Sequence, residues 1–300
     1  MAILINKNTK VLVQGITGKE GSRAAREMLG FGTKVIAGVT PGKGDSTTDE
    51  GVPVFNSVSE AVKEFPEINA TLIVVPPAFV LEAFLEAVWS KIPLVNILTE
   101  KIPVANVAQM IAYAKNYGIC LVGPSSVGIL VPGVSKIGSI GSSDVGNRIF
   151  TPGPVGVISK SGGMTAEISK ILTEAKIGQS TVIGIGGDLL IGSDFVQIIK
   201  EFEKDPQTKA VVIFGEVGGT YEEKLAEKIK SKEIKKPVIA LIAGKFAETL
   251  PQDTILGHAG AIVSRGRGSA ISKMKALKEA GALIAETPED IPILVKQVLK

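Results

Sequence analysis

One histidine stands among glycines in the second half of the chain. It is His258 in the segment TILGHAGAI, with Gly257 and Gly260 around it, and it is the only histidine in 300 residues. A neutral imidazole, with an ordinary pKa of about 6.5, is a capable nucleophile toward phosphorus. A lone histidine is more often structural, but glycines on both sides leave this one little to pack against. His258 is therefore a candidate nucleophile.

Glycine clusters follow three predicted strands in the same half. ISKSGG places Ser161, Gly162 and Gly163 between a strand and a helix, where the free N–H groups of a helix start bind anions. GEVGG places Glu216 at another strand end, where its carboxylate could orient an imidazole ring. GIGGD ends a third strand with Asp188. Each cluster alone is also typical of ordinary loops, but together they mark one edge of a sheet as a ligand edge.

A further glycine cluster opens the first half. QGITGKEG spaces Gly15, Gly18 and Gly21 as GxxGxxG between a strand and a helix, which suits a bound phosphate. The next strand ends in VTPGKGD and offers Lys43, where a dinucleotide-binding fold carries an acidic residue for the ribose. An ordinary Pro-Gly turn with a solvated lysine is the alternative. The pair of motifs favours a phosphorylated ligand over NAD.

Short β-branched runs alternate with amphipathic stretches along the whole chain. Strands are predicted at 10–15, 34–39, 71–76, 94–99, 119–123, 155–159, 180–186, 210–215, 237–244 and 282–286. Helices are predicted at 21–32, 78–91, 107–118, 163–175, 194–204, 221–232, 269–280 and 288–300. A stretch rich in Gly, Ser and Pro at 132–154 interrupts the alternation. The pattern predicts two Rossmann-like α/β domains, at 1–130 and 155–300, joined by a linker at 131–154.

Composition narrows the class of protein. The hydrophobic fraction of 45% and the charged fraction of 21% are typical of a globular α/β protein. A net charge of +3 and 5% aromatic residues disfavour a nucleic-acid partner. Cys120 is the only cysteine, which suits a reducing compartment. No basic leader or apolar run of membrane-spanning length occurs in the sequence. We expect a cytoplasmic protein without a membrane partner.

These motifs together resemble a known family. The chain is similar, end to end, to the α subunit of succinyl-CoA synthetase, a nucleoside-diphosphate-forming acid–CoA ligase. The likeness rests on VQGITGKEG, GTKVIAGVTPGKG, GVPVFNSVSEAV, GIGGD, FEKDPQT, GEVGG and GHAGAI. It implies a Rossmann-like CoA-binding domain followed by a flavodoxin-like α/β ligase domain that carries the phosphohistidine.

The resemblance also implies roles for individual residues. His258 would be phosphorylated, Glu216 would hold its ring, and Ser161, Gly162 and Gly163 would bind phosphate. Coenzyme A would lie along the glycine-rich edge of the first domain, with its phosphates near the first helix, its adenine near the second strand and its pantetheine arm farther along. The residues implied there are Gly15, Thr17, Gly18, Lys19, Glu20, Val39, Pro41, Lys43, Thr99 and Glu100.

The family reaction has three steps. A nucleotide phosphorylates the histidine, the phosphoryl group passes to a carboxylate, and the CoA thiol displaces phosphate from the acyl phosphate. ATP or GTP and Mg²⁺ bind a separate ATP-grasp β subunit, in an αβ or α2β2 assembly. The resemblance therefore implies that this chain works only with such a partner and holds no catalytic metal itself.

Departures from succinyl-CoA synthetases cluster near the acid. The chain reads GPSSVG for their GPNCPG, SKSGGM for SRSGTL and TILGHAG for KRMGHAG, and its 136–155 segment is longer. In these places it resembles the CoA-ligase part of ATP-citrate lyase. Ser125, Ser126, Gly163 and Met164 are the residues expected near the acid. Glycine in place of threonine at 163 makes room for a bulkier acid, so citrate is slightly favoured and succinate is the alternative.

Two other classes of function fit these residues less well. A CoA-sensing module would keep the fold without catalysis, but His258, Glu216 and Ser161 are all in place. An NAD-dependent dehydrogenase is disfavoured by Lys43 and by the missing acidic residue. The sequence leaves open the choice between ATP and GTP, the oligomeric state and the physiological direction of the reaction.

Overall fold

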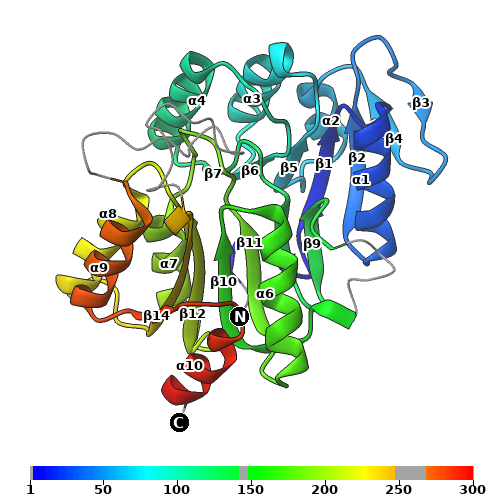
Figure 1. Ribbon diagram of the computed structural model, residues 1–300. Coiled ribbons are helices and arrows are strands. Elements are labelled where there is room, and N and C mark those ends of the chain that lie inside the picture. Colours follow the sequence, from blue (N-terminus) through cyan, green and yellow to red (C-terminus); the bar gives the residue numbers. More distant parts are fainter. Residues whose placement is uncertain (1–2, 142–147, 247–267, 300) are drawn as a thin grey trace.

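The computed structural model describes residues 3–141, 148–246 and 268–299. It contains two seven-stranded sheets, one in each half of the chain, seen side by side in Figure 1. Helices pack on both faces of each sheet, as expected for parallel strands joined by crossover helices. The predicted α/β class with two Rossmann-like units is confirmed.

The first sheet has the strand order β3-β4-β2-β1-β5-β6-β7. Apart from the antiparallel edge strand β3, its order is that of a dinucleotide-binding fold. Its strands are β1 (Lys10–Gln14), β2 (Lys34–Val39), β3 (Ser46–Thr47), β4 (Pro53–Phe55), β5 (Ala70–Ile73), β6 (Leu94–Ile97) and β7 (Cys120–Val122). Its helices are α1 (Lys19–Gly30), α2 (Val58–Glu64), α3 (Val80–Trp89) and α4 (Val104–Tyr117), with a 3-10 turn, η1 (Pro77–Phe79).

Alternation along β1 divides the first domain into two cores. Val11 and Val13 belong to the core that includes residues of α1, whereas Leu12 belongs to the core that includes Phe84 of α3. Successive side chains of a strand point to opposite faces of the sheet, so a run of apolar residues serves both. Because β1 is packed on both faces, it fixes the position of the glycine-rich turn that follows it.

The second sheet has the order β14-β13-β12-β10-β11-β8-β9. Its five parallel strands follow the flavodoxin-like order, and β8 and β9 extend it as antiparallel strands. Its strands are β8 (Gly128–Val131), β9 (Ser135–Gly138), β10 (Pro152–Ser159), β11 (Gln179–Gly184), β12 (Ala210–Glu216), β13 (Val238–Ala243) and β14 (Leu283–Ala285). Its helices are α6 (Gly162–Glu174), α7 (Phe195–Lys204), α8 (Tyr221–Lys230), α9 (Ala270–Ala280) and α10 (Asp290–Val298). In Figure 1, α6 and α10 lie on one face, and α7, α8 and α9 lie on the other.

The chain passes between the sheets earlier than the predicted linker. Residues 128–130 lie within the predicted first domain, yet they belong to β8 and pair with β11 of the second sheet. Residues 135–138, inside the predicted linker, form β9 and contact α1 of the first domain. Two buried groups fix this contact: Lys136 lies 3.6 Å from the Glu27 carboxylate, and the Thr33 hydroxyl donates to the Lys136 carbonyl at 2.8 Å. Residues 128–138 therefore bind the two domains together.

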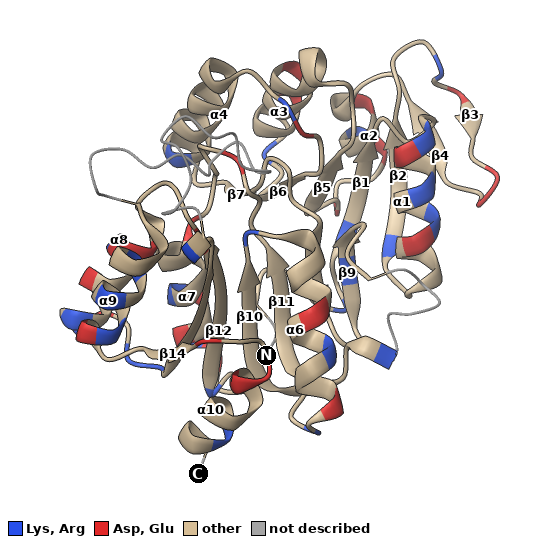
Figure 2. Ribbon diagram, in the orientation of Figure 1, with Lys and Arg blue, Asp and Glu red and all other residues tan. Residues whose placement is uncertain are grey.

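Both signs of charge alternate along the exposed helices. Figure 2 shows Lys and Arg interspersed with Asp and Glu on α1, α8 and α9. Within the described residues, no helix is both long and apolar enough to cross a bilayer.

Candidate functional site

The ten residues expected to bind CoA gather at one edge of the first sheet. They lie just after or at the carboxyl ends of β1, β2 and β6. The strand order reverses between β1 and β5, and in open α/β sheets ligands bind beside such a point. The structure thus places these residues together, while their contact with CoA stays a prediction.

The turn after β1 requires glycine. Gly15 has φ +87°, and a Cβ there would lie 2.6 Å from the carbonyl oxygen of Val74 after β5. A Cβ on Gly21 would lie 2.1 Å from the carbonyl oxygen of Gly15. Gly18 is the N-cap of α1, and since it has no side chain, the first N–H groups of the helix can be offered to an anion. The close packing of the chain in this turn thus requires its glycines, and phosphate binding there stays a prediction.

Hydroxyl groups join the turns after β1 and β2. The Thr17 hydroxyl donates to that of Thr40 at 3.1 Å, and Thr40 donates to the carbonyl of Val39 at 2.8 Å. Lys43 and Pro41 are exposed in the second turn, whereas Val39 is buried. The edge therefore presents a lysine and a proline ring on a fixed backbone.

Charges on the first turn of α1 are exposed. Lys19 and Glu20 both face solvent, and Glu20 pairs with Arg23 at 2.5 Å. The hydrogen bond from Arg23 lowers the pKa of Glu20. Glu20 therefore stays ionised, and the nearby Arg23 offsets its repulsion of an anionic ligand.

The segment 123–127 connects this edge to the second domain. Ser125 donates its N–H to the carbonyl of Thr99 at 3.1 Å and its hydroxyl to Asp188 at 2.9 Å. Thr99 in turn donates to the Val75 carbonyl at 2.7 Å, and Glu100 beside it is exposed. The candidate pantetheine contacts of the first domain are thus hydrogen-bonded, through one serine, to the GIGGD loop of the second.

Ser126 has a structural role in this junction. It is 1% exposed, and its hydroxyl accepts from Asn96 of β6 at 2.7 Å and donates to the Gly184 carbonyl of β11 at 2.5 Å. It also accepts the Gly128 N–H at 3.0 Å. The hydroxyl of this predicted acid neighbour is therefore engaged in holding the two sheets together.

Val127 packs directly against the predicted phosphate cradle. A Cβ on Gly162 would lie 2.4 Å from Val127 Cγ1, and a Cβ on Gly184 would lie 2.5 Å from Val127 Cγ2. In contrast, a Cβ on Gly163 would meet no described atom within 4 Å beyond its immediate neighbours in the chain and helix. Of the two adjacent glycines, one is closely packed and the other faces open space.

The cradle itself is the first turn of α6. Ser161 is its N-cap, and its hydroxyl accepts the N–H of Met164 at 3.4 Å. The Ser161 carbonyl accepts both the N–H and the hydroxyl of Thr165, at 3.0 and 2.7 Å. Ser161, Gly162 and Met164 are half-buried and Gly163 is exposed. The predicted phosphate-binding residues thus form a helix start that lies at the surface.

Glu216 ends β12, beside β10, and is 8% exposed. Its Oε1 atom lies 3.3 Å from Nζ of Lys160, the residue just before the helix cap. The strand order of the parallel part of the second sheet reverses between these two strands, so Glu216 and the start of α6 lie at the ligand edge of this fold. Lys160 was not among the sequence candidates; its position between a buried strand and SGG was the available signal.

His258 lies outside the described residues, so its place relative to Glu216 stays a prediction. Among the described residues, no group of three or more His, Cys, Asp or Glu side chains could hold a metal ion.

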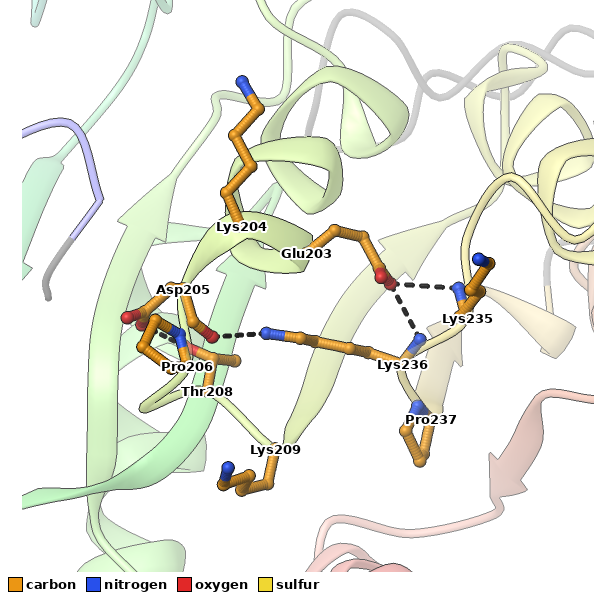
Figure 3. Close-up of a pocket in the computed structure, with 9 residues that line it drawn as sticks. All are labelled: Glu203, Lys204, Asp205, Pro206, Thr208, Lys209, Lys235, Lys236 and Pro237. Atoms are coloured by element: carbon orange, nitrogen blue, oxygen red, sulfur yellow. Dashed lines mark hydrogen bonds between the residues drawn. The ribbon is translucent and has the colours of Figure 1, made fainter.

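A pocket of about 440 Å³ lies at the opposite edge of the second sheet, before β12 and β13 (Figure 3). Its polar groups bind one another. The Glu203 carboxylate accepts the N–H groups of Lys235 and Lys236 at 2.9 and 2.7 Å, and the Lys236 ammonium donates to the carbonyls of Phe202 and Asp205. The pocket accounts for much of the FEKDPQT motif as a structural turn, distant from the candidate site.

Comparisons with known proteins assign each of the two domains to a family. Residues 6–101 match the CoA binding domain model, and residues 158–283 match the CoA-ligase model. The succinate–CoA ligase [ADP-forming] subunit alpha 2 of Archaeoglobus fulgidus is 46% identical over 299 residues, which cover 100% of both chains. The subunit alpha of Aquifex aeolicus is 48% identical over 302 residues, covering 100% of this chain and 95% of that one.

Among solved structures, ATP citrate lyase of Methanothrix soehngenii, in complex with citrate and coenzyme A, superposes with a TM-score of 0.91 at 27% identity. The match covers 99% of this chain and 50% of that one, so this chain spans half the length of the lyase. An acetyl-coenzyme A synthetase of Ca. Korarchaeum cryptofilum, at 22% identity and a TM-score of 0.75, shares the fold.

A CoA-binding domain followed by a CoA-ligase domain defines the class of protein: this chain is part of a CoA ligase, an enzyme that forms a carbon–sulfur bond. The sequence identity of 46–48% to the alpha subunits, over the full length of the chain, shows the family. The chain belongs to the family of succinate–CoA ligase [ADP-forming] alpha subunits.

Proposed function

We propose that this chain is the CoA-binding, phosphohistidine subunit of an acid–CoA ligase, and that it works with an ATP-grasp β subunit. The segment 123–127 is the observation that supports this most. It is hydrogen-bonded to Thr99 at the CoA edge and packs on Gly162 at the phosphate cradle. One short segment thus contacts both candidate sites, as required if an acyl phosphate is to meet a thiol.

The reaction proceeds in three balanced steps. On the partner, where Mg²⁺ would also bind, the γ-phosphoryl group of the nucleoside triphosphate forms a P–N bond to His258 as its bond to the departing nucleoside diphosphate breaks. A carboxylate oxygen of the acid then attacks phosphorus, which frees the imidazole and gives an acyl phosphate. Finally the CoA sulfur attacks the acyl carbon, a C–S bond forms, and inorganic phosphate leaves after the thiol proton is lost.

Residues that the structure describes orient the imidazole and bind the phosphate groups in these steps. Glu216 accepts the imidazole N–H, so that the other ring nitrogen is free to attack. The first turn of α6, capped by Ser161, stabilises the phosphoryl oxygens through its N–H groups. Lys43 and the turn at Gly15–Gly18 bind the CoA phosphates.

For the acid, we propose citrate. The open space beside Gly163 supports it, because the succinyl-CoA synthetase pattern carries a threonine at this position. Succinate is the second candidate, and the names of the full-length relatives favour it. The CoA-ligation rate of the reconstituted pair, measured with citrate, succinate and malate in turn, tests both. A rate with succinate that exceeds the rate with citrate would contradict the citrate assignment.

A further inference from the structure

Lys160 is a buried cation at the ligand edge of the second sheet. Its side chain is 1% exposed, and its ammonium lies 3.3 Å from the Glu216 carboxylate and 6.0 Å from the centre of the Tyr221 ring. The backbone N–H of Lys160 donates to the carbonyl of Phe214 in β12 at 3.1 Å. Burying an ammonium is costly unless a partner compensates, so the pairing with Glu216 constrains both side chains.

A second buried pair fixes the main chain of Glu216. The Lys273 ammonium of α9 donates to the carbonyls of Glu216 and Gly218, at 2.8 and 2.5 Å, and pairs with Glu222 of α8. Lys273 and Glu222 are both 0% exposed. The N–H of Glu216 donates to the other Glu222 oxygen at 3.3 Å. With its backbone held on both sides, Glu216 can vary only in the direction of its carboxylate, which Lys160 restricts.

We propose that Lys160 is a positioning residue of the ligase, acting through Glu216. This inference rests on the proposed function, in which Glu216 orients the imidazole of the phosphorylated histidine. Lys160 sets the direction of the carboxylate and balances its charge. The carboxylate then accepts an imidazole N–H but gives little extra stability to the imidazolium, whose nitrogens are not nucleophilic.

Among the described residues, two oppositely charged pairs lie at Glu216. Lys160 offsets Glu216 on the β10 side, and Lys273 offsets Glu222 on the side of α8 and α9. Glu223 of α8 lies half-buried near Lys273 and Glu222, and burial raises its pKa, which favours its neutral form. Removing the charge at Lys160 therefore makes the surroundings of the imidazole more negative by one charge. This charge stabilises the protonated ring and moves the acid limb of the rate profile to higher pH.

Three variants test the inference in the complex with the β subunit: Lys160→Met, Lys160→Gln and Lys160→Arg. The readout is the rate of transfer of ³²P from the nucleoside triphosphate to the chain, followed from pH 5.5 to pH 8.5. The two neutral variants should lose about tenfold in kcat at pH 7, the scale typical of a group that orients a catalytic ligand. Their KM for the nucleotide should be unchanged. The Arg variant, which keeps the charge, should recover the wild-type rate and profile.

Labelling of the wild-type complex distinguishes a failure of the proposed function from a failure of the role of Lys160. An unlabelled wild-type complex overturns the proposed function itself. A labelled wild type with a neutral variant that folds and keeps the wild-type rate and profile overturns the role of Lys160 alone. If burial makes both neutral variants unfold, as melting curves would show, the Arg variant decides: a folded Arg variant with a lost or shifted profile also overturns it.

Discussion

Val127 occupies the space that a side chain on Gly162 would need. A Cβ there would lie 2.4 Å from Val127 Cγ1, whereas a Cβ on the next residue, Gly163, would meet no described atom within 4 Å beyond its chain and helix neighbours. Two adjacent glycines of the predicted cradle therefore differ in what they tolerate, and this difference can be measured.

Gly162→Ala should destabilise the protein by about 1–3 kcal/mol, because the added methyl overpacks the contact with Val127. Gly163→Ala should leave the free energy of unfolding unchanged or raise it by up to about 1 kcal/mol. Denaturant unfolding of both variants checks this. The double variant Val127→Ala with Gly162→Ala should recover part of the loss, and equal costs at 162 and 163 would refute the packing argument.

Gly163→Thr should change the choice of acid. A threonine fills the open space beside the cradle, so kcat/KM with citrate should fall about tenfold or more relative to succinate, the scale of a few methylene-sized clashes. Steady-state CoA ligation with each acid measures the ratio. Gly163→Ala is the matched control, and its ratio of kcat/KM for citrate to that for succinate should lie between the ratios of the wild type and of Gly163→Thr. A ratio that does not move would remove Gly163 from the acid site.

Lys43→Ala should weaken CoA binding by about fivefold, or about 1 kcal/mol, because one charge-assisted contact with a CoA phosphate is lost. Lys34, the first residue of β2, is also exposed and lies at the opposite end of that strand from the turn that holds Lys43, so Lys34→Ala provides the matched control. Calorimetric titration with CoA compares the two. Histidine phosphorylation should be normal in both variants, and equal CoA affinity would place the phosphates elsewhere.

Cys120 should be inert at neutral pH. Burial in β7 raises the pKa of its thiol to about 11, and the Ser193 hydroxyl 3.8 Å away offsets only part of this shift. Only the thiolate reacts, so at pH 8 alkylation of the native chain should be about a hundredfold slower than that of the unfolded chain. Its rate should rise steadily between pH 8 and pH 11. Equal rates for native and unfolded chains would contradict the burial of this sulfur.

The main strands and helices could be predicted from the sequence because their patterns are strong. Long apolar runs such as 34–39 and 210–215 are buried on both faces of a parallel sheet, and β2 and β12 lie at those positions within one residue at each end. The elements β3, β4 and α2 were not predicted. β3 consists of two exposed polar residues, β4 has three residues and begins with a proline, and α2 has only seven residues.

The junction between the domains was harder to predict for a physical reason. β9 reads SKIG, and a serine and a lysine in a glycine-rich stretch are typical of an exposed loop. Both are buried, because Glu27 and Thr33 of the other domain supply their partners. Because the partners that compensate for burying Ser135 and Lys136 lie about 100 residues earlier in the sequence, no local pattern predicts this burial.

Residues of the candidate site in the second domain could also be predicted only in part. Glycine clusters at strand ends gave the positions of Ser161 and Glu216, because parallel strands bring their carboxyl ends to one edge. The position of Lys160 before SGG indicates that it lies near the cradle, but only the pairing of β10 with β12 reveals its contact with Glu216.

Phosphoryl transfer to a single residue, His258, is the step on which the proposed function depends. The chain and its β subunit are incubated with γ-³²P-labelled nucleoside triphosphate and Mg²⁺, and the labelled site is mapped by mass spectrometry. We predict an acid-labile, base-stable label on His258 that CoA and the correct acid remove together, and that His258→Asn abolishes. A label elsewhere on the chain, or full ligase activity in the His258→Asn complex, would contradict it.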